Sequence, residues 1–200
     1  MTEKNHIKKI LEKYEKRISE LEKNFEKKIK NDLKNSKKIK QKCSKIKLIL
    51  TDVDGVLTDG GMYYSNEGEA TKKFNTRDGM GVELLLKNNI KTIFITKEKS
   101  TIAKKRGKKV KAASVHIGVL RKETELVKIC KKFAIKPNDI AYIGDDVNDI
   151  EIMRKVGFSS APSDSNYKVK KIVDYVCSSK GGSGAFRELA DLILSTKSRN

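Results

Sequence analysis

The first part of the chain carries a repeating apolar pattern. Apolar residues stand at positions 7, 11, 14, 18, 21 and 25, so the spacing alternates between four and three, and Lys and Glu fill most of the other positions. This heptad spacing predicts an amphipathic helix. After Phe25 the next apolar residues, Ile29 and Leu33, follow at intervals of four, so the apolar stripe moves around the helix.

Two interpretations of this segment remain open. It is either a coiled coil of about three heptads, which is near the minimum length, or an extended amphipathic helix that packs on nothing in particular. Residues 34–45 contain many Lys residues and few apolar ones, which predicts a solvated linker. The expected organisation is therefore a basic helical arm and linker over residues 1–45, a globular domain over 46–195 and a tail over 196–200.

From residue 46 onward, short apolar runs alternate with segments of helical period. Strands are expected at 46–50, 92–96, 114–117, 140–143, 158–161 and 173–176, and helices at 79–88, from 100 onward, and at 121–133, 148–156 and 185–194. Strands that alternate with helices predict an α/β domain with a parallel sheet. Residues 61–74 predict a β-hairpin around the turn-forming residues 65–68. This insertion is too short to form a separate lid domain.

Acidic residues follow two of the predicted strands. Asp52 and Asp54 come directly after residues 46–50, and the segment 144–149 reads Gly-Asp-Asp-Val-Asn-Asp after residues 140–143. Alternate residues of a strand point the same way, and parallel sheets bind ligands at the edge where their strands end. A cation relieves the repulsion between neighbouring carboxylates, and Mg²⁺ prefers oxygen ligands. The pattern predicts a Mg²⁺ site, and for either cluster alone an Asp- and Gly-rich turn is the alternative.

Charge, cysteine content and hydropathy indicate the expected binding partners and location of the protein. The chain of 200 residues has a formal net charge of +19, to which residues 1–45 contribute +9 from sixteen basic and seven acidic residues. Because Lys predominates over Arg and no pattern of aromatic and Arg residues is present, attraction of anionic substrates is expected rather than nucleic-acid binding. Three cysteines without paired spacing predict reduced thiols in the cytoplasm. No apolar run is long enough to predict a membrane span.

The acidic segments belong to a larger set of motifs with a family resemblance. Asp52-Val-Asp-Gly-Val, Thr96, Lys122 and Gly144-Asp-Asp-x-x-Asp149 resemble the four motifs of the haloacid dehalogenase superfamily of phosphatases. More narrowly, residues 51–60, 74–79, 144–149 and 181–188 resemble the 3-deoxy-D-manno-octulosonate 8-phosphate phosphatases. The resemblance covers about residues 46–195. It implies a Rossmann-like parallel sheet without a large cap domain, and a homotetramer that the hairpin helps to assemble.

The resemblance also implies roles for the motif residues. Asp52 is expected to be the nucleophile, and Asp54 to protonate the leaving sugar oxygen and then to accept a proton from water. Thr96 and Lys122 are expected to contact the phosphoryl group. The expected Mg²⁺ ligands are the carboxylates of Asp52 and Asp145 and the backbone carbonyl of Asp54. Asp146 or Asp149 is expected to hold these ligands in place without binding the ion directly. For Thr96 alone, capping of the following helix is the alternative.

A further set of residues is expected to bind the substrate. Backbone amides at a helix start, together with Arg77, suit a carboxylate or a phosphate. The expected substrate-binding residues are Asn75, Thr76, Arg77, Asp78, Gly79 and Arg106, together with Asp54 and Lys122. The alternatives are that Asp78 is an N-cap with Arg77 on the surface, and that Arg106 lies on a solvated helix face. The segment 181–188 is expected to approach the site of an adjacent subunit.

The expected function is Mg²⁺-dependent hydrolysis of a phosphorylated acidic sugar, with 3-deoxy-D-manno-octulosonate 8-phosphate as the first choice of substrate. One departure bears on that choice, because Lys97 and Glu98 follow Thr96 where the family usually has Gly and Arg. This is closer to the variants associated with sialic acid synthesis, so an N-acylneuraminate 9-phosphate phosphatase is the alternative. A non-catalytic phosphatase-like scaffold, with the arm as its interaction module, is the alternative from another class.

Overall fold

The computed structural model describes residues 3–197, and within the first helix it describes the side chains of residues 12–14, 16–25 and 33 onward. The chain divides into two compact units, residues 1–39 and residues 40–200. No helix in the described part of the chain combines the length and the apolar character that crossing a membrane requires.

The N-terminal arm is helical throughout the part that is described. Helix α1 (Glu3–Ser44) is continuous, so the segment expected as a solvated linker at residues 34–45 is helical up to Ser44, and most of it is exposed to solvent as expected. Lys favours helical conformation and does not interrupt it. The last turn belongs to the second unit, because Cys43 is buried and Lys42 pairs with Asp174 there.

The apolar stripe of the arm faces solvent where it is described. Its side chains are each more than half exposed at the five positions Tyr14, Ile18, Leu21, Phe25 and Leu33. The remaining stripe positions, Ile7, Leu11 and Ile29, lie outside the residues whose side chains are described.

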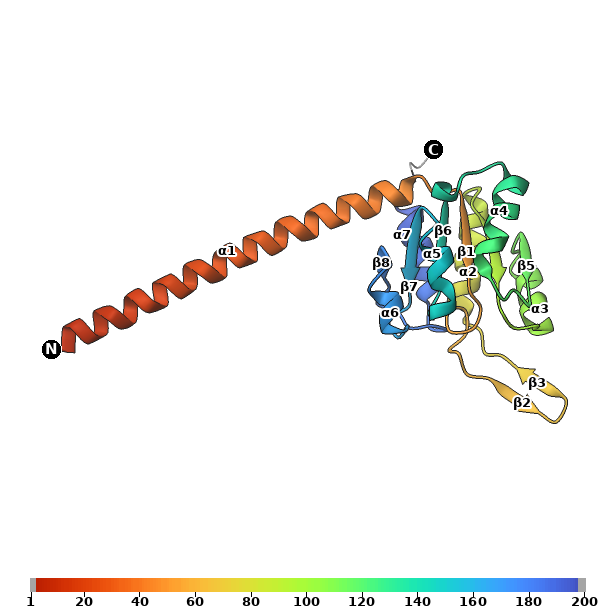
Figure 1. The fold of residues 1–200 in the computed structure, drawn as a ribbon, viewed down its shortest axis with the longest axis horizontal. Helices are drawn as coiled ribbons and strands as arrows, with labels where there is room; N and C mark the ends of the chain where they lie inside the picture. Colours follow the sequence, from red (N-terminus) through yellow and green to blue (C-terminus); the bar gives the residue numbers. More distant parts are fainter. Residues whose placement is uncertain (1–2, 198–200) are drawn as a thin grey trace. The chain divides into compact units, whose positions relative to one another are not determined.

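The second unit is built on a six-stranded parallel sheet (Figure 1). Its strands lie in the order β5 (Ser114–His116), β4 (Lys91–Ile95), β1 (Leu48–Thr51), β6 (Ile140–Ile143), β7 (Phe158–Ala161) and β8 (Tyr175–Val176). The helices are α2 (Thr76–Lys87), α3 (Thr101–Lys109), α4 (Lys122–Phe133), α5 (Ile150–Met153), α6 (Tyr167–Lys170) and α7 (Ala185–Leu194). This confirms the Rossmann-like α/β fold.

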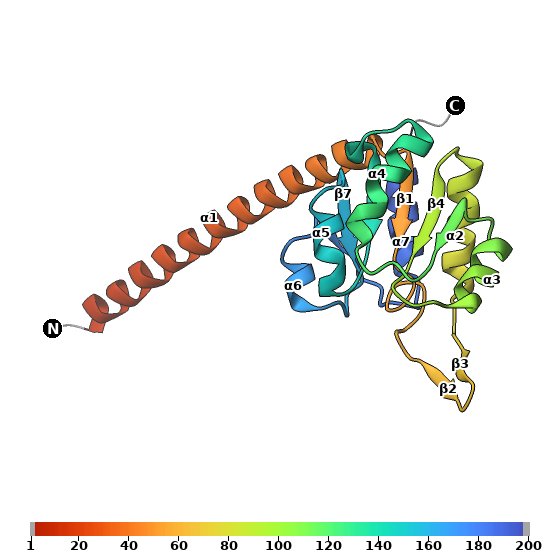
Figure 2. The same ribbon diagram turned by 45° about the vertical axis from the view of Figure 1, so that its right-hand side comes forward.

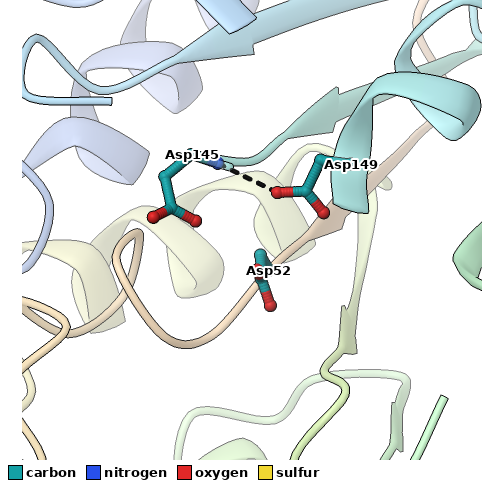
Figure 3. A group of neighbouring side chains, drawn as sticks. All are labelled: Asp52, Asp145 and Asp149. Carbon is teal, nitrogen blue, oxygen red and sulfur yellow. Dashed lines mark hydrogen bonds between the residues drawn. The ribbon is translucent and has the colours of Figure 1, made fainter. Parts of the chain in front are cut away.

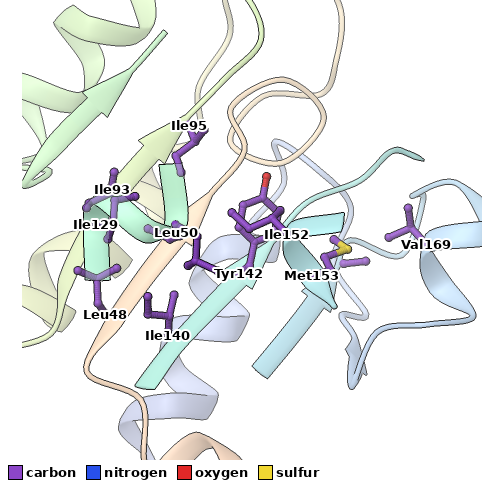
Figure 4. Close-up of a cluster of buried hydrophobic side chains, with 12 residues drawn as sticks. Leu48, Leu50, Ile93, Ile95, Ile129, Ile140, Tyr142, Ile152, Met153 and Val169 are labelled. Carbon is purple, nitrogen blue, oxygen red and sulfur yellow. The ribbon is translucent and has the colours of Figure 1, made fainter. Parts of the chain in front are cut away.

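The core explains why these apolar runs form strands. Every residue of β1, β6 and β7 is buried, which is typical of strands that are covered on both faces. Leu48 and Leu50 of β1 pack with Ile129 of α4 and Ile152 of α5 on one face of the sheet (Figure 4). Helices α2 and α7 pack against each other on the other face (Figure 2).

Most differences from the expected elements lie at their ends. Helix α2 begins at Thr76 rather than at residue 79, because Asn75 caps it by accepting a hydrogen bond from the backbone N–H of Arg77. The helix expected at 148–156 is a 3₁₀ turn (Val147–Asp149) followed by the short α5, and α6 was not expected. Strand β8 is shorter than the expected 173–176.

The hairpin is present and extends away from the sheet. Strands β2 (Tyr63–Ser65) and β3 (Gly68–Thr71) pair antiparallel and project beyond the edge where β1 ends (Figures 1 and 2). From β1 the chain crosses to β4 and β5 on one side and later returns to β6 on the other side. The point at which strand order reverses is where open α/β sheets bind ligands.

Candidate active site

A cavity of about 400 Å³ opens at the edge where β1, β4 and β6 end. It is lined by residues of the three loops that follow these strands: Asp52, Asp54, Gly55, Gly60, Thr96, Lys97, Glu98, Asp145, Asp146, Val147 and Asn148. Both acidic clusters contribute to the lining, as expected for segments that follow neighbouring parallel strands. The cavity is therefore the candidate active site.

Asp52 is held in one orientation at the floor of the cavity. Its side chain is almost buried, its Oδ1 accepts a hydrogen bond of 2.7 Å from the backbone N–H of Val53, and its Oδ2 lies 2.7 Å from Lys122 Nζ. Lys122 is 1% exposed and stands at the first position of α4. Each carboxylate oxygen of Asp52 thus has a donor that limits its rotation.

Asp149 organises the site through its hydrogen bonds, and Figure 3 shows the one that it accepts from Asp145. Its Oδ1 accepts hydrogen bonds from Lys122 Nζ and Tyr142 Oη, both at 2.6 Å, and its Oδ2 accepts one of 3.0 Å from the backbone N–H of Asp145. A Cβ at Gly144 would lie 2.3 Å from Asp149 Oδ2, so glycine allows this close approach. Asp149 therefore fixes both Lys122 and the loop that carries Asp145.

Three carboxylates converge on this position. Asp52, Asp145 and Asp149 each place one oxygen within 4.8 Å of the others. Burial, followed by the negative charge of Asp149, raises the pKa of Asp52 well above its usual range and that of Asp145 to about 7. For Lys122, burial opposes the charge, but the fields of Asp52 and Asp149 outweigh it and raise the pKa.

This charge balance fits a divalent cation. The cluster holds three carboxylates and one ammonium group, which contacts Asp52 and Asp149, so two negative charges are not balanced by side chains of the cluster. The donor set is entirely oxygen, which is the chemistry that Mg²⁺ prefers. Asp149 is fully buried and does not line the cavity, whereas Asp52 and Asp145 do, so the carboxylates of Asp52 and Asp145 are better placed as ligands. Asp145 Oδ2 also packs against Gly55, where a Cβ would lie only 2.1 Å away.

Asp54 lies between the sheet edge and the hairpin. Its Oδ2 accepts a hydrogen bond of 3.1 Å from Thr96 Oγ1, and its Oδ1 lies 2.5 Å from Lys72 Nζ. The alternative that Thr96 caps the next helix is wrong, because Ser100 is the N-cap of α3. Sequence reasoning missed Lys72, since nothing in the sequence distinguishes it from the many other lysines.

Among the expected substrate-binding residues, Asp54 lines the cavity, whereas residues 75–79 and Arg106 lie outside its lining. Arg106 Nη2 donates a hydrogen bond of 2.9 Å to the backbone oxygen of Asn75, and its guanidinium lies over the Phe74 ring. Asp78 is buried, which raises its pKa to about 6, and it accepts a hydrogen bond from the backbone N–H of Arg187. The alternative that Asp78 is the N-cap of α2 is wrong, because Asn75 has that role.

Within one chain, the contacts of residues 75–79 and Arg106 are structural. None of Asn75, Thr76, Arg77, Asp78, Gly79 and Arg106 lines the cavity, and the bonded members join the start of α2 to α3 and α7. Thr76 and Arg77 are exposed. A role of this set in binding substrate therefore remains a prediction.

The glycine-rich segment before α7 supports the cavity of its own chain. The backbone N–H of Gly182 donates a hydrogen bond of 2.9 Å to the oxygen of Val56. A Cβ at Gly181 would lie 2.0 Å from the backbone oxygen of Gly55. Within the chain, this segment presses against the loop that follows β1. Its expected approach to an adjacent subunit remains a prediction.

Comparisons with known proteins agree with this geometry. A family model described as haloacid dehalogenase-like hydrolase matches residues 56–189. The 3-deoxy-D-manno-octulosonate 8-phosphate phosphatase of Haemophilus influenzae is 38% identical over 162 residues, which cover 81% of this chain and 90% of that protein. The phosphatase of the same name from Escherichia coli K12 is 39% identical over 153 residues, covering 76% and 81% of the two chains.

Solved structures of similar proteins share the fold. The 3-deoxy-D-manno-octulosonate 8-phosphate phosphatase of Moraxella catarrhalis, solved with a magnesium ion, a phosphate ion and a KDO molecule, has a TM-score of 0.77 and 36% identity, covering 80% of this chain and 91% of that chain. The Yersinia pestis phosphatase has a TM-score of 0.78 and 34% identity, covering 80% and 86%.

Proposed function

The chain belongs to the haloacid dehalogenase-like hydrolases, and on this basis we propose that it is a Mg²⁺-dependent phosphatase that hydrolyses 3-deoxy-D-manno-octulosonate 8-phosphate to the free sugar acid and phosphate. The observation that carries the proposal is the convergence of Asp52 and Asp145, from the ends of β1 and β6, beside the buried ammonium of Lys122. The similarity to phosphatases of that substrate supports the choice of sugar.

In the first half of the reaction, a carboxylate oxygen of Asp52 attacks the phosphorus atom. The new O–P bond forms as the P–O bond to the sugar breaks, and the electron pair of that bond leaves with the sugar oxygen. Asp54 donates its carboxyl proton to this oxygen, so the sugar leaves as an alcohol. The contacts of Asp52 with Val53 and Lys122 hold the attacking carboxylate in position.

In the second half, water attacks the phosphorus atom of the phosphoryl group on Asp52. The Asp54 carboxylate accepts the proton of that water, and the O–P bond to Asp52 breaks with its electron pair returning to the carboxylate. Phosphate is released and both carboxyl groups regain their starting states. Lys122 and Thr96 place an ammonium and a hydroxyl group beside these two acids, where negative charge on the phosphoryl oxygens needs donors.

The carboxylates of Asp52 and Asp145 and the backbone carbonyl of Asp54 are the proposed ligands of Mg²⁺. When bound, the ion supplies positive charge that stabilises the transferring phosphoryl group. Asp149 holds the Asp145 loop through its bond to the backbone N–H of Asp145, so it acts on the ligand set without being part of it.

A second substrate is supported by the cavity itself. Lys97 and Glu98 line it directly beside Thr96. A substrate that reaches these side chains meets one positive and one negative charge, whereas the family usually presents Gly and Arg there. N-acylneuraminate 9-phosphate is therefore the alternative substrate within the same reaction class.

We also propose an assembly and a location. The hairpin exposes Met62, Tyr63 and Tyr64, which suits the homotetramer that the resemblance implies, since aromatic and Met side chains are enriched at interfaces. The three cysteines are free thiols, which supports a cytoplasmic location.

The arm is proposed to pair with the arm of a second copy. With Ile18 and Phe25 at a positions and Tyr14 and Leu21 at d positions, Arg17 takes position g and Glu22 takes position e of the next heptad. In a parallel, in-register coiled coil these positions meet across the pair, so Arg17 of one copy faces Glu22 of the other. In an antiparallel pair g positions face g positions, so Arg17 would not face Glu22 of the other copy, and charge favours the parallel arrangement.

Phosphate release from a panel of sugar phosphates, measured with Mg²⁺ or with EDTA, tests the proposed function. We expect release from 3-deoxy-D-manno-octulosonate 8-phosphate with Mg²⁺ only, and no release by Asp52→Asn. Release confined to nine-carbon acids would move the assignment to the alternative substrate. A folded protein that releases phosphate from none of the panel would contradict the phosphatase assignment and favour a scaffold.

A further inference from the structure

Lys72 is a buried cation beside the proposed acid. It follows β3 at the base of the hairpin, its side chain is 0% exposed, and its Nζ contacts both Asp54 Oδ1 and Glu69 Oε1. The neighbouring Lys73 differs sharply, because its side chain is 67% exposed and pairs with Asp59 on the surface. Two adjacent lysines thus have opposite environments, and only Lys72 touches Asp54.

The position of Lys72 is set from two sides. Glu69 Oε2 accepts a hydrogen bond of 2.6 Å from Ser100 Oγ. Ser100 is the N-cap of α3, where its Oγ accepts a hydrogen bond from the backbone N–H of Ala103. Glu69 therefore ties Lys72 to a helix start as well as to the hairpin, and Lys72 cannot move without breaking this series of contacts.

The chemistry of an ammonium group restricts what its partner can do. Lys72 Nζ lies between the carboxylates of Asp54 and Glu69, and two neighbouring negative charges favour the ammonium form of a lysine. An ammonium group donates hydrogen bonds and accepts none. A proton on Asp54 Oδ1 would point at this donor, so the proton of the acid is excluded from that oxygen.

The other oxygen of Asp54 has a partner that tolerates either state. Thr96 Oγ1 lies 3.1 Å from Asp54 Oδ2, and a hydroxyl group can donate to a carboxylate or accept from a carboxylic acid. Thr96 also lines the cavity, whereas Lys72 does not. Oδ2 is therefore the oxygen that can both carry a proton and lie beside a residue of the cavity wall.

We propose that Lys72 is a positioning residue that confines the transferable proton of Asp54 to Oδ2, and so aims the acid at the leaving oxygen of the substrate. This inference rests on the proposed phosphatase function. It assigns the hairpin a role in the chemistry of its own chain, in addition to any role in assembly. Lys72 acts through Asp54 and does not line the cavity.

The test compares two leaving groups in the full-length protein. The sugar of 3-deoxy-D-manno-octulosonate 8-phosphate leaves as an alkoxide that needs a proton, whereas p-nitrophenolate leaves without one. The variants are Lys72→Met, Lys72→Arg and, as the matched control, Lys73→Met. The quantity is kcat/KM, which reports the steps up to cleavage of the ester bond.

We expect Lys72→Met to lower kcat/KM for the sugar phosphate about 10²-fold, the lower end of what a positioned acid contributes, and that for p-nitrophenyl phosphate less than about threefold. Lys72→Arg, which keeps the charged donor, should recover most of the loss, and Lys73→Met should match the parent protein. Retained turnover of p-nitrophenyl phosphate shows that the variant is folded.

Equal losses on both substrates, or no loss on either, would overturn the role of Lys72. These results differ from failure of the proposed function, in which the parent protein releases phosphate from neither substrate. The ratio of the two kcat/KM values therefore tests Lys72, and the parent activity tests the function.

Discussion

Lys122 Nζ lies 2.7 Å from Asp52 Oδ2, and this contact joins the start of α4 to the end of β1 inside the sheet edge. The ammonium group also lies 2.6 Å from Asp149 Oδ1. It is therefore the one cation that the acidic cluster contacts among the described residues. We propose that this buried charge has two roles: it holds the Asp52 carboxylate for the reaction, and it stabilises the fold by compensating the buried carboxylates.

Replacing Lys122 should separate these two effects. We expect Lys122→Met to lower kcat about 10²-fold or more, because a positive charge near the phosphoryl group is lost. Without metal, the variant should also lose about 3–5 kcal/mol of unfolding free energy, since breaking a buried pair leaves carboxylates uncompensated. Urea unfolding in EDTA and in Mg²⁺ measures this loss, which should shrink when the ion is present.

Lys128→Met is the matched control for that experiment. Lys128 is on the same helix, but its side chain is 72% exposed and its pair with Glu125 is on the surface. Exposed pairs contribute about 0–1 kcal/mol, so this variant should behave like the parent protein. Similar losses for the two variants would show that the buried contact has no special importance.

Glu188 predicts a pH-dependent contribution to stability. Its Oε1 accepts hydrogen bonds from Tyr175 Oη and the backbone N–H of Ser178, and its Oε2 accepts one from the backbone N–H of Ser179. Burial opposes ionisation, but these bonds outweigh it and lower the pKa of Glu188 from 4.5 to about 2. A lowered carboxyl pKa stabilises the fold above the unfolded value and loses this effect as pH falls through the folded value.

The expected result is that Glu188→Gln loses about 1–2 kcal/mol of unfolding free energy at pH 7, at the low end for charged hydrogen bonds because the group is partly exposed. The difference in unfolding free energy between the variant and the parent protein should shrink as pH falls from 4.5 toward 2. Urea titrations at a series of pH values measure it. Glu151→Gln, in an exposed pair with Arg154, is the control, and a gap that stays constant with pH would refute the assignment.

The proposed pairing of two arms can be tested by crosslinking one copy to another. In a parallel, in-register pair, Leu21 of one copy lies beside Leu21 of the other, so Leu21→Cys should form a disulfide-linked dimer under mild oxidation. Lys16→Cys, at an outward f position of the same heptads, should not. Denaturing electrophoresis without reductant distinguishes the two.

Charge reversal then tests the orientation of the pair. Arg17→Glu in the Leu21→Cys background should weaken crosslinking, because Glu then faces Glu22 of the second copy, and adding Glu22→Arg should restore it. Each pair contributes about 0.2–1 kcal/mol, so the symmetric change should alter the arm association constant roughly tenfold. A crosslinking yield that changes with neither substitution would argue against parallel pairing.

The sequence by itself determined the layered fold and the place of the site. Apolar runs such as residues 140–143 and 158–161 became β6 and β7 at those positions, because burial on both faces requires an unbroken apolar strand. Asp52 and Asp145 met as expected, because the ends of neighbouring parallel strands share one edge whatever the details of packing. The motif assignment of Lys122 depended on a family resemblance, and the structure places that side chain against Asp52.

Only the tertiary structure decided which polar partners meet. Lys72 and Lys73 are adjacent and chemically identical in the sequence, yet one is buried against Asp54 and the other is exposed. The choice depends on where the hairpin returns to the sheet edge and on Ser100, which binds Glu69 from 31 residues further along the chain. Helix and strand signals are local, whereas the environment of a charged side chain is the sum of long-range contacts. A sequence this rich in lysine therefore could not identify its buried cation before folding brought the partners together.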